Sequence, residues 1–400
     1  MIQIRNLDDL LKNDLKGKII QIRADLNLPI SDGKILDKTR IMSLKPTIKE
    51  LQRTGCKISI LSHFGRPKGK VVRKMSLKPI IPELEKSLNS KVLFLNDYSS
   101  DKTKKIITKA PNGSILLMEN TRFHKGEEKN YKYFSKNIAN FSDYYVNDAF
   151  SVAHRNHASV TGLTEFLPSF AGRSLEKEII AIDNLLDSDN KKKLAIIGGS
   201  KISTKISLIN NLIKKVNVLI IGGGMANTFL LAKGKEIGKS LCEKSMLNIA
   251  NKIMKNASKY NCKIILPSDA LVAYSLKKNG KYSEYNIENI PNNGLILDIG
   301  TNTIKIIEKE ISKMKEVLWC GPLGLFEQNP FHTGTASVAK IISKLTKNGR
   351  ITSVAGGGDT VAAISQSNYI NDFTFISTAG GAFLEMIAGQ KLPGIEVLKK

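Results

Sequence analysis

The chain has 400 residues, 42% of them hydrophobic and 24% charged, so it can form two or three globular domains with large cores. Its formal net charge is +25, from 61 Lys and Arg against 36 Asp and Glu. Four cysteines without a C-x-x-C pair argue against a disulfide framework or a zinc knuckle, and no apolar run is long enough for a membrane span.

The first elements of the chain indicate the compartment. Asp8, Asp9 and Asp14 stand where a signal peptide would have its apolar stretch. Unpaired cysteines fit a reducing environment. We therefore predict a cytoplasmic protein.

Short apolar runs then alternate with longer amphipathic runs, which is typical of βα units and parallel sheets. In the first half we predict a helix over Ser76–Leu88 and strands over Lys18–Arg23, Lys57–Leu61, Lys91–Leu95, Ser114–Met118 and Asp143–Val146. In the second half we predict strands over Leu194–Ile197, Val216–Ile221, Cys262–Leu266, Leu295–Leu297, Glu316–Trp319, Ile351–Val354 and Phe373–Ile376. Helices are predicted over Ser203–Lys214, Ser245–Ala257 and Thr335–Thr346.

A domain boundary is predicted near Leu167–Gly172, where Pro168 and Gly172 interrupt the pattern. The next segment, Ser174–Leu186, has apolar residues at helical spacing and is predicted to join the halves. The expected fold is α/β, with two Rossmann-like lobes over 1–172 and 173–387, each a parallel sheet flanked by helices, joined by a hinge helix.

Basic clusters follow the predicted strands of the first half, and ligands of open parallel sheets bind beyond the carboxyl ends of the strands. The cationic residues are Arg23, Arg40, His63, Arg66, Arg122 and Arg155. Each could be a surface ion-pair partner, but gathered at one sheet edge they would repel one another without an anion. Asp25 and Asn27 add acceptors that suit hydroxyl groups. Together these residues predict a phosphorylated sugar acid as ligand.

Glycine-rich turns follow the predicted strands of the second half. They are Gly198-Gly199-Ser200-Lys201, Gly222-Gly223-Gly224, Gly356-Gly357-Gly358-Asp359 and Gly380-Gly381. Backbone amides at such turns approach phosphate closely, and Mg²⁺ in kinase sites takes one or two carboxylates besides the phosphates. Asp359 is the predicted metal ligand, although Asp359 and Thr360 could instead cap a helix.

Three further features remain open from the residues alone. Lys201 and Lys205 are four residues apart, so on one helix both ammonium groups could face a phosphate or merely solvent. His154 and His157 have a helical spacing that could bind metal, but no supporting ligand lies near them in sequence, so we favour a structural role. Trp319 is predicted to lie in the core.

The cationic cluster, the glycine turns and the metal ligand together indicate a kinase, and two other classes of function compete with this interpretation. Gly222-Gly223-Gly224 begins a dinucleotide-binding fingerprint, but Asn227 replaces its last glycine and no P-loop motif occurs. A net charge of +25 could serve a nucleic acid, or it could be compositional drift spread over solvent faces. With only 6% aromatic residues, and with arginines at strand ends rather than along one helix, we expect no specific nucleic-acid binding. Without a long apolar run, we also expect no membrane partner.

Nine segments in series resemble the phosphoglycerate kinase family, over essentially the whole chain. They are Arg23–Pro29, Leu61–Pro67, Glu119–Phe123, Asn147–Phe150, Ala153–Arg155, Gly198–Lys201, Gly222–Ala226, Gly321–Glu327 and Gly356–Thr360. The closing Leu392-Pro393-Gly394 agrees as well. The resemblance implies reversible phosphoryl transfer from 1,3-bisphosphoglycerate to ADP, giving 3-phosphoglycerate and ATP in glycolysis, with Mg²⁺ and as a monomer. It also implies that the tail, 388–400, packs back on the first domain.

The resemblance assigns roles to single positions. Phosphoglycerate would be bound in the N-terminal domain by Asp25, Leu26, Asn27, Arg40, His63, Phe64, Gly65, Arg66, Arg122 and Arg155. The nucleotide would be bound in the C-terminal domain by Lys201, Lys205, Gly222, Gly223, Gly300, Glu327, Gly357, Gly358, Asp359 and Thr360. The groups implied to act on the transferring phosphoryl are Arg40, Lys201, Gly380 and Gly381, with Asp359 on Mg²⁺.

Two positions depart from the family pattern. Cys320 stands where the family usually has Asn beside the nucleotide, which removes a side-chain hydrogen bond worth ~0.5–1.5 kcal/mol. Ala379 stands where a third glycine is frequent and is expected to crowd that turn slightly. Since the two predicted sites lie on different lobes, hinge closure is also expected, with hinges at Ser174–Leu186, Cys320–Leu325 and Ala379–Gly381.

Overall fold

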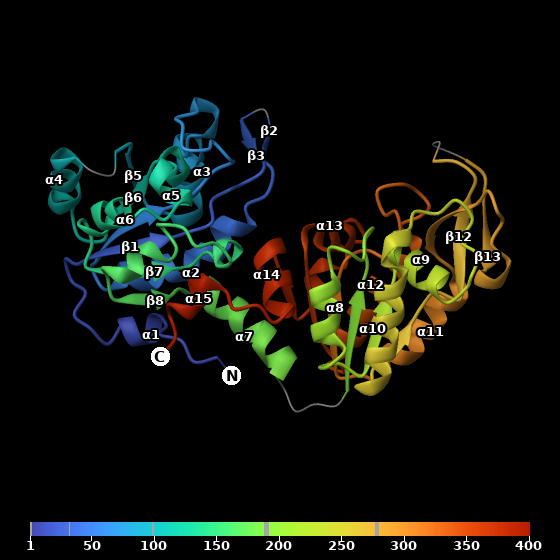
Figure 1. Ribbon diagram of the computed structural model, residues 1–400. Helices are drawn as coiled ribbons and strands as arrows, with labels where there is room; N and C mark the ends of the chain where they lie inside the picture. The colour runs from blue at the N-terminus through green and yellow to red at the C-terminus, as the bar shows by residue number, and fades with distance from the viewer. Residues whose placement is uncertain (1, 32, 98–99, 188–191, 277–279) are drawn as a thin grey trace. The chain divides into compact units, whose positions relative to one another are not determined.

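The computed structural model describes residues 2–31, 33–97, 100–187, 192–276 and 280–400, and the chain forms two compact units (Figure 1). Unit 1 comprises Met1–Ile180 and Lys391–Lys400, and unit 2 comprises Ala181–Gln390. The division falls inside helix α7, Arg173–Asp187. The boundary that we predicted, at 172, precedes this helix.

Unit 1 contains a six-stranded parallel sheet in the order β5-β6-β4-β1-β7-β8. The strands are β1 Ile19–Arg23, β4 Lys57–Leu61, β5 Val92–Leu95, β6 Ile115–Met118, β7 Tyr144–Asn147 and β8 Ser169–Ala171; β2 Ile30–Ser31 and β3 Lys34–Ile35 form a separate hairpin. The helices are α1 Leu7–Leu10, α2 Thr39–Arg53, α3 Ile81–Leu88, α4 Asp101–Lys109, α5 Lys125–Glu128, α6 Lys132–Ala139, part of α7, and α15 Pro393–Glu396.

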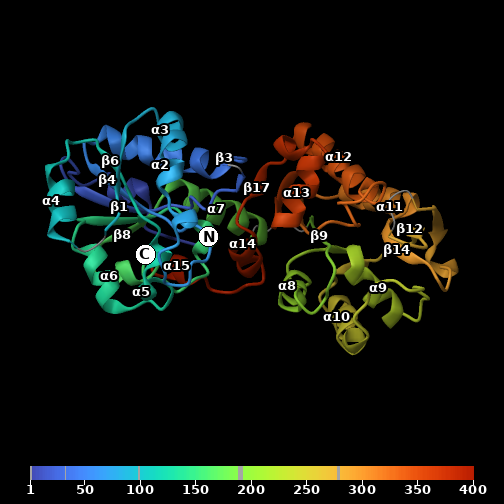
Figure 2. The same ribbon diagram turned by 90° about the horizontal axis from the view of Figure 1, so that it is seen from above.

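Both faces of this sheet are buried, as expected for parallel strands between helices. Ile58 and Ile60 of β4 point into a core with α1, α2 and α3. Leu116 of β6 and Tyr145 of β7 point into a second core with α4 and α6. The alternation of side chains along each strand therefore produces three layers, which Figure 2 shows with α2 and α3 on one side and α5 and α6 on the other.

The segment that we interpreted as a boundary contains the edge strand of this sheet. β8 pairs with β7 in parallel, and Pro168 lies just before it. Gly172 follows β8 because a Cβ there would lie 2.4 Å from the carboxyl carbon of Asp148. That carboxylate accepts the N–H groups of Ser174 and Leu175, at the first turn of α7. Pro168 and Gly172 thus delimit a three-residue strand, which was too short for its periodicity to be recognised.

The last ten residues belong to unit 1. The N–H of Gly394 donates to the carbonyl of Ala153 at 2.8 Å, and the N–H of Arg5 donates to the carbonyl of Leu398 at 2.8 Å. Leu398 is fully buried. The beginning and the end of the chain therefore complete the same unit.

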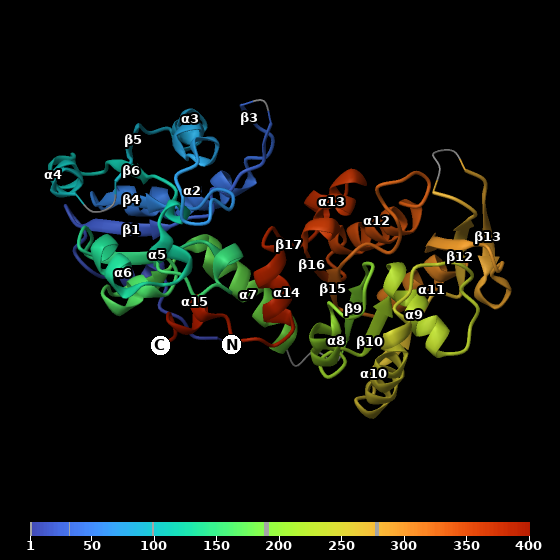
Figure 3. The ribbon, with the colours of Figure 1, turned by 45° about the horizontal axis from the view of Figure 1, so that its top comes forward.

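Unit 2 contains a second six-stranded parallel sheet, in the order β11-β10-β9-β15-β16-β17. Its strands are β9 Lys193–Ile197, β10 Val218–Ile221, β11 Lys263–Ile265, β15 Glu316–Cys320, β16 Thr352–Gly356 and β17 Phe375–Ser377. The helices are α8 Ile206–Leu212, α9 Gly223–Ala232, α10 Leu247–Lys259, α11 Thr301–Ile311, α12 Thr333–Lys347, α13 Gly358–Gln366 and α14 Gly380–Ile387. In Figure 3, α12 and α13 cover one face of this sheet and α8 and α10 cover the other. Trp319 of β15 is fully buried, as predicted.

One predicted strand of unit 2 lies in a different sheet. β14, Leu295–Ile299, pairs with β12, Asp269–Ala273, in an antiparallel sheet that also contains β13, Tyr282–Asn286. Helix α11 packs beside it (Figure 2). We did not predict β12 or β13, and β13 is almost wholly exposed and polar, so it carries no hydrophobic pattern. The two parallel sheets flanked by helices nevertheless confirm the predicted α/β fold with Rossmann-like lobes.

Candidate active site

The basic residues of unit 1 lie at one edge of its sheet. Arg23 ends β1, His63 comes two residues after β4, and Arg122 lies in the turn that follows β6. Because β6, β4 and β1 are neighbours and parallel, their carboxyl ends bring these three residues together. The segment after β7 adds Ser151 and Arg155 from the adjacent strand. The gathering that we inferred from strand ends is therefore present in the structure.

Asp25, Asn27 and Arg40 are linked by hydrogen bonds. Arg40 donates from Nη1 to Asp25 Oδ1 at 3.0 Å and to the carbonyl of Asn27 at 2.7 Å. Ser151 donates to the other oxygen of Asp25. Asn27 Oδ1 accepts the N–H of Gly65 at 2.9 Å. Asp25 thus orients Arg40, whose side chain remains 27% exposed and able to meet an anion.

Arg122 is held more tightly than Arg40. Arg122 is largely buried. Its Nη1 donates to the carbonyl of Gly65 at 2.9 Å, and its Nε lies 3.4 Å from Oε1 of Glu128. Asn120, fully buried, donates to the carbonyls of Phe64 and Met75 and so fixes the turn after β4. Leu26 donates its N–H to Ser62 Oγ in the same turn. The turns of three strands are therefore tied to one another around the cationic residues.

Arg66 and Arg155 differ from the others because both are exposed. Within the described residues, neither guanidinium makes a hydrogen bond or an ion pair with the protein. Free guanidinium groups beside a cationic edge are donors for a phosphate or a carboxylate, which they contact with two parallel hydrogen bonds.

Arg23 is not a surface ligand, contrary to its place in the cationic set that we listed from the sequence. Its exposed fraction is 0%, and its guanidinium contacts Ser159, the carbonyl of Ala24 and the ring of His63. This burial could not be predicted from the sequence, because an arginine at the end of a strand is usually exposed. Arg23 supports the site from beneath.

Three histidines of unit 1 have lowered pKa values, because they are buried and lie near positive charges. Burial and the charges of Arg23 and Arg122 lower the pKa of His63 well below 6.5. Burial lowers the pKa values of His154 and His157 to about 4. The charge of Arg155 adds to this effect at His154, and the charge of Arg122 adds to it at His157. The helical spacing that we considered for His154 and His157 is wrong, since the short helical turn before them ends at Val152. A proton is thus disfavoured throughout this region, whereas an anion is favoured.

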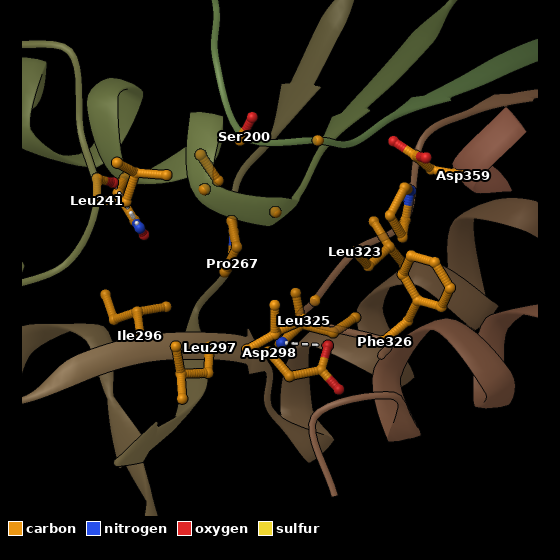
Figure 4. Close-up of a pocket in the computed structure, with 18 of the residues that line it drawn as sticks. Ser200, Leu241, Pro267, Ile296, Leu297, Asp298, Leu323, Leu325, Phe326 and Asp359 are labelled. Atoms are coloured by element: carbon orange, nitrogen blue, oxygen red, sulfur yellow. Dashed lines mark hydrogen bonds between the residues drawn. The ribbon is translucent and has the colours of Figure 1, made fainter. Parts of the chain in front are cut away.

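Unit 2 contains a cavity of about 260 Å³ (Figure 4). Leu241 and Ile296 line one end, and Leu323 and Phe326 line the other, next to Asp359. Glu327 is exposed and also lines the cavity. An apolar wall with carboxylates near its mouth suits a flat heterocycle that carries hydroxyls and phosphates.

The turn glycines are required by close contacts between backbones. A Cβ on Gly198 would lie 1.9 Å from the carbonyl oxygen of Pro322. Gly223 has φ +66°, and a Cβ there would lie 2.7 Å from the backbone N and O of Gly199. Gly199 and Gly223 both line the cavity. The turns after β9, β10 and β15 therefore pack backbone against backbone, and side chains would separate them.

Four of the five glycines predicted to bind the nucleotide, Gly222, Gly300, Gly357 and Gly358, do not line this cavity, and the first two pack behind its wall. Gly222 packs against the side chain of Leu323, where a Cβ would come within 2.3 Å. Gly300 packs against the carboxylate of Asp269, which accepts the N–H groups of Asn302 and Thr303 at the start of α11. Both glycines shape the walls of the site rather than its surface.

The turn after β16 presents Gly357, Gly358 and Asp359. Gly357 has φ +98°, and no atom lies within 4 Å of a Cβ built on Gly358, so the N-terminus of α13 is open. Asp359, exposed in the first turn, has no ion pair within the described part of the chain. Thr360 is buried and accepts the N–H of Gly321 at 2.6 Å, so its hydroxyl supports the turn. A Cβ on Gly380 would lie 3.6 Å from the N atom of Gly358, which places the turn before α14 beside this one.

The helical spacing that we considered for Lys201 and Lys205 is wrong. Helix α8 begins at Ile206, so Lys205 precedes the helix and Lys201 lies in the turn after β9. A Cβ on Gly199 would lie 3.4 Å from Cε of Lys205, which places this lysine over the glycine turn. Lys201 is exposed. Both lysines are near the glycine turn through the loop rather than through a shared helix face.

The structure adds Asp298, which we did not single out from the sequence, and shows the surroundings of Cys320 and Ala379, which we did. Asp298 lines the cavity and is almost fully buried, which raises its pKa to about 8, although it accepts the N–H groups of Ile299 and Gly334. Cys320 is 0% exposed, and burial raises the pKa of its thiol to about 12. Ala379 is buried with φ −102°, so the turn before α14 needs no left-handed residue at this position.

Comparison with known proteins covers both units. A family model described as phosphoglycerate kinase matches residues 7–390. Phosphoglycerate kinase of Methylorubrum populi is 47% identical over 399 residues, covering 100% of this chain and 99% of that protein. The protein of the same name from Brucella melitensis is also 47% identical and is covered over its whole length. The solved structure of phosphoglycerate kinase from Coxiella burnetii has a TM-score of 0.90 and 38% identity, covering 99% of this chain and 98% of that one.

These matches agree with the motifs and with the two parallel sheets. They confirm the activity predicted from the sequence, that of a phosphotransferase with a carboxyl group as acceptor. The chain belongs to the phosphoglycerate kinase family.

Proposed function

We propose that unit 1 binds the phosphoglycerate and unit 2 binds the nucleotide in the reversible conversion of 1,3-bisphosphoglycerate and ADP to 3-phosphoglycerate and ATP. The observation that carries this assignment is the contrast between the sites. The first is lined by Arg40, Arg66, Arg122 and Arg155, and the second by an apolar cavity beside open glycine turns. The first suits a small polyanion with hydroxyls, and the second suits an adenine nucleotide.

Within unit 1, Arg40, Arg66, Arg122 and Arg155 would contact the phosphate and carboxylate, with Asp25 and Asn27 at the hydroxyl. The residues Leu26, Phe64 and Gly65 would contribute backbone around the ligand. Gly65 fits this role because its N–H and carbonyl are already fixed by Asn27 and Arg122. His63, nearly buried beneath them, would donate one further hydrogen bond.

Within unit 2, the heterocycle would lie between Leu241 and Leu323, with Glu327 at the ribose. The phosphates would lie toward Gly357 and Gly358, where the free N–H groups at the start of α13 favour negative charge. Lys201 and Lys205 would neutralise the phosphates from the turn after β9. The phosphates would thus contact both backbone N–H donors and the side chains of two lysines.

Asp359 fits Mg²⁺, because it is an exposed carboxylate without an ion pair in the described chain and stands beside the proposed phosphate site. Bound there with ATP or ADP, Mg²⁺ would neutralise charge on the phosphate oxygens. Within the described residues, no group of three or more His, Cys, Asp or Glu side chains could hold a metal. This agrees with a metal held mainly by the nucleotide.

The chemistry requires no general base. In the direction that consumes ATP, the attacking group is a carboxylate, ionised at pH 7 because ordinary carboxyl pKa values are about 3.3–4.3. Catalysis then depends on alignment and on stabilising the charge of a loose transition state. We assign this stabilisation to Arg40 and Lys201, and to the backbone N–H groups of Gly380 and Gly381.

We further propose that the sites meet through hinge closure, with hinges at Ser174–Leu186, Cys320–Leu325 and Ala379–Gly381, in a cytoplasmic monomer. In the part of the chain that the structure describes, no helix is long and apolar enough to cross a membrane. Small-angle scattering should show compaction only with both substrates bound. Unchanged dimensions with both present would contradict closure.

The decisive experiment for the reaction is ATP- and Mg²⁺-dependent turnover of 3-phosphoglycerate in a coupled reductive assay. Lys201→Ala should lower kcat by roughly 10²–10³ while phosphoglycerate affinity stays similar, because it removes a cation from the transferring phosphoryl only. The control is Lys214→Ala, which removes an exposed lysine just after helix α8. Near-normal turnover of Lys201→Ala would remove this lysine from the mechanism.

A further inference from the structure

A buried arginine lies directly beneath the proposed phosphoglycerate site and has no surface to offer a ligand. Arg23 is 0% exposed, at the end of the central strand β1. A buried guanidinium is costly unless its N–H groups are satisfied and its charge is compensated. Its partners therefore show what it does.

One side of Arg23 is anchored to a buried carboxylate through a serine. Nε of Arg23 donates to Ser159 Oγ at 2.8 Å, and Ser159 donates that hydroxyl to Glu127 Oε1 at 2.5 Å. The N–H of Ser159 donates to Glu127 Oε2 at 3.0 Å. Glu127 is 0% exposed, so the charge of Arg23 has a partner in the same buried cluster. Nη1 donates to the carbonyl of Ala24, which fixes the plane of the guanidinium.

The other side of Arg23 meets the ring of His63. Nη2 of Arg23 lies 3.1 Å from Nδ1 of His63. A guanidinium has five N–H donors and no acceptor, so this hydrogen bond can form only if Nδ1 carries a lone pair. The ring must then be neutral with its proton on Nε2.

The largest effects on the ring all disfavour a second proton. Burial comes first, followed by the positive charges of Arg23, Arg122 and Arg40, and finally His157. His63 is 5% exposed, and Nε2 has no hydrogen-bond partner among the residues that the structure describes. The ring therefore keeps one N–H donor that no described residue uses.

We propose that Arg23 is a positioning residue that holds His63 as the neutral tautomer with its proton on Nε2, so that His63 donates a hydrogen bond to the phosphoglycerate. The tautomer decides whether the contact between Nε2 and the anionic ligand is attractive or repulsive. With the proton on Nδ1, Nε2 would direct a lone pair at an anionic ligand and repel it. Arg23 thus acts on substrate affinity without touching the substrate. This inference rests on the proposed function of unit 1.

The direct test is nitrogen NMR of the ¹⁵N-histidine-labelled, ligand-free enzyme. The His63 signals, assigned from their loss in His63→Gln, should show an unprotonated Nδ1 and a protonated Nε2 on both sides of pH 6.5, where ordinary histidine titrates. A protonated Nδ1, or a mixture of the two tautomers near neutral pH, would overturn the inference. This result does not depend on activity.

The second test uses Arg23→Lys, which keeps the charge but not the planar group that reaches Ser159 and His63 together. We expect His63 to mix tautomers and to titrate nearer 6.5, and the Kd for 3-phosphoglycerate to rise roughly tenfold or more, with ADP affinity unchanged. Arg5→Lys is the matched control, since Arg5 is a half-buried arginine of unit 1 bonded to the carbonyl of Val397. Unchanged tautomer and affinity in Arg23→Lys would contradict the proposal.

A third comparison remains valid if Arg23→Lys does not fold. In His63→Gln the amide N–H₂ can reach the position of Nε2, whereas His63→Leu has no donor. The Gln variant should bind 3-phosphoglycerate more tightly than the Leu variant by roughly tenfold. Equal affinities would show that the donor has no role. An Nε2-protonated His63 in an enzyme without turnover would instead contradict only the proposed function.

Discussion

Each unit contains a six-stranded parallel sheet, but the anion sites that we propose for them are built in different ways. Unit 1 uses charged side chains: four of the chain's five histidines, His63, His124, His154 and His157, and all the site arginines lie there. Unit 2 uses backbone: glycine turns after neighbouring strands stand next to an apolar cavity. A side-chain site is sensitive to charge and pH, whereas a backbone site is sensitive to any atom added to a turn.

The largest expected effect tests whether the proposed site of unit 1 depends on its charged side chains. Arg40→Ala should lower kcat by roughly 10²–10³, because it removes a preorganised cation and leaves Asp25 without its ion pair. The measurement is the coupled assay at saturating substrates. Arg53→Ala, an exposed arginine on the same helix α2, is the control and should be near normal. Equal effects of the two variants would break the comparison.

The next largest effect tests whether the proposed site of unit 2 depends on the close packing of its glycine turns. Gly223→Ala should raise the Kd for ADP by roughly tenfold or more, because its Cβ would displace the turn at Gly199 and its φ of +66° is strained for alanine. Calorimetry should show unchanged 3-phosphoglycerate binding. Gly234→Ala is a matched control with φ +76° and no atom within 4 Å of a Cβ. If both variants weaken ADP binding equally, strain rather than contact is responsible.

Acid should affect the units in opposite directions. The pKa values of His154 and His157 are lowered to about 4, so the unfolded chain binds protons more readily than the folded chain below pH 6.5, and unit 1 loses stability as pH falls from 6.5 toward 4. Asp148, with its pKa raised to about 7, partly offsets this loss. In unit 2 the pKa of Asp298 is raised to about 8, so this group favours folding as pH falls.

Hydrogen exchange across this pH range can compare β1 and β4 of unit 1 with β9 and β15 of unit 2. After correction for intrinsic exchange rates, protection should fall first in unit 1. His157→Gln should reduce that loss, because glutamine does not titrate. Earlier loss in unit 2 would contradict the assignment of the titrating groups.

The smallest effect concerns salt. Affinity for 3-phosphoglycerate should fall severalfold between low and high salt, because its site consists of partly exposed cations whose attraction is screened. Affinity for adenosine, which has no phosphate, should change little, since the cavity of unit 2 is mainly apolar. Equal salt dependence would mean that charge does not distinguish the sites.

Sequence reasoning predicted most of the parallel strands because buried strands such as β4 read as continuous apolar runs. It missed β8 and β13 because the first has three residues and the second is polar and exposed. The motif residues of both sites could be predicted because they follow strands directly. The burial of Arg23 could not, since it depends on Ser159 and Glu127, more than a hundred residues away.

The return of the final ten residues to unit 1 has a consequence for biosynthesis. Residues 391–400 leave the ribosome after all of unit 2, yet Leu392, Ile395 and Leu398 are buried in unit 1. The polypeptide that emerges first is therefore finished last, while unit 2 is contiguous and can fold as soon as it is made. Vectorial synthesis should leave unit 1 open to proteolysis on the ribosome until the tail docks.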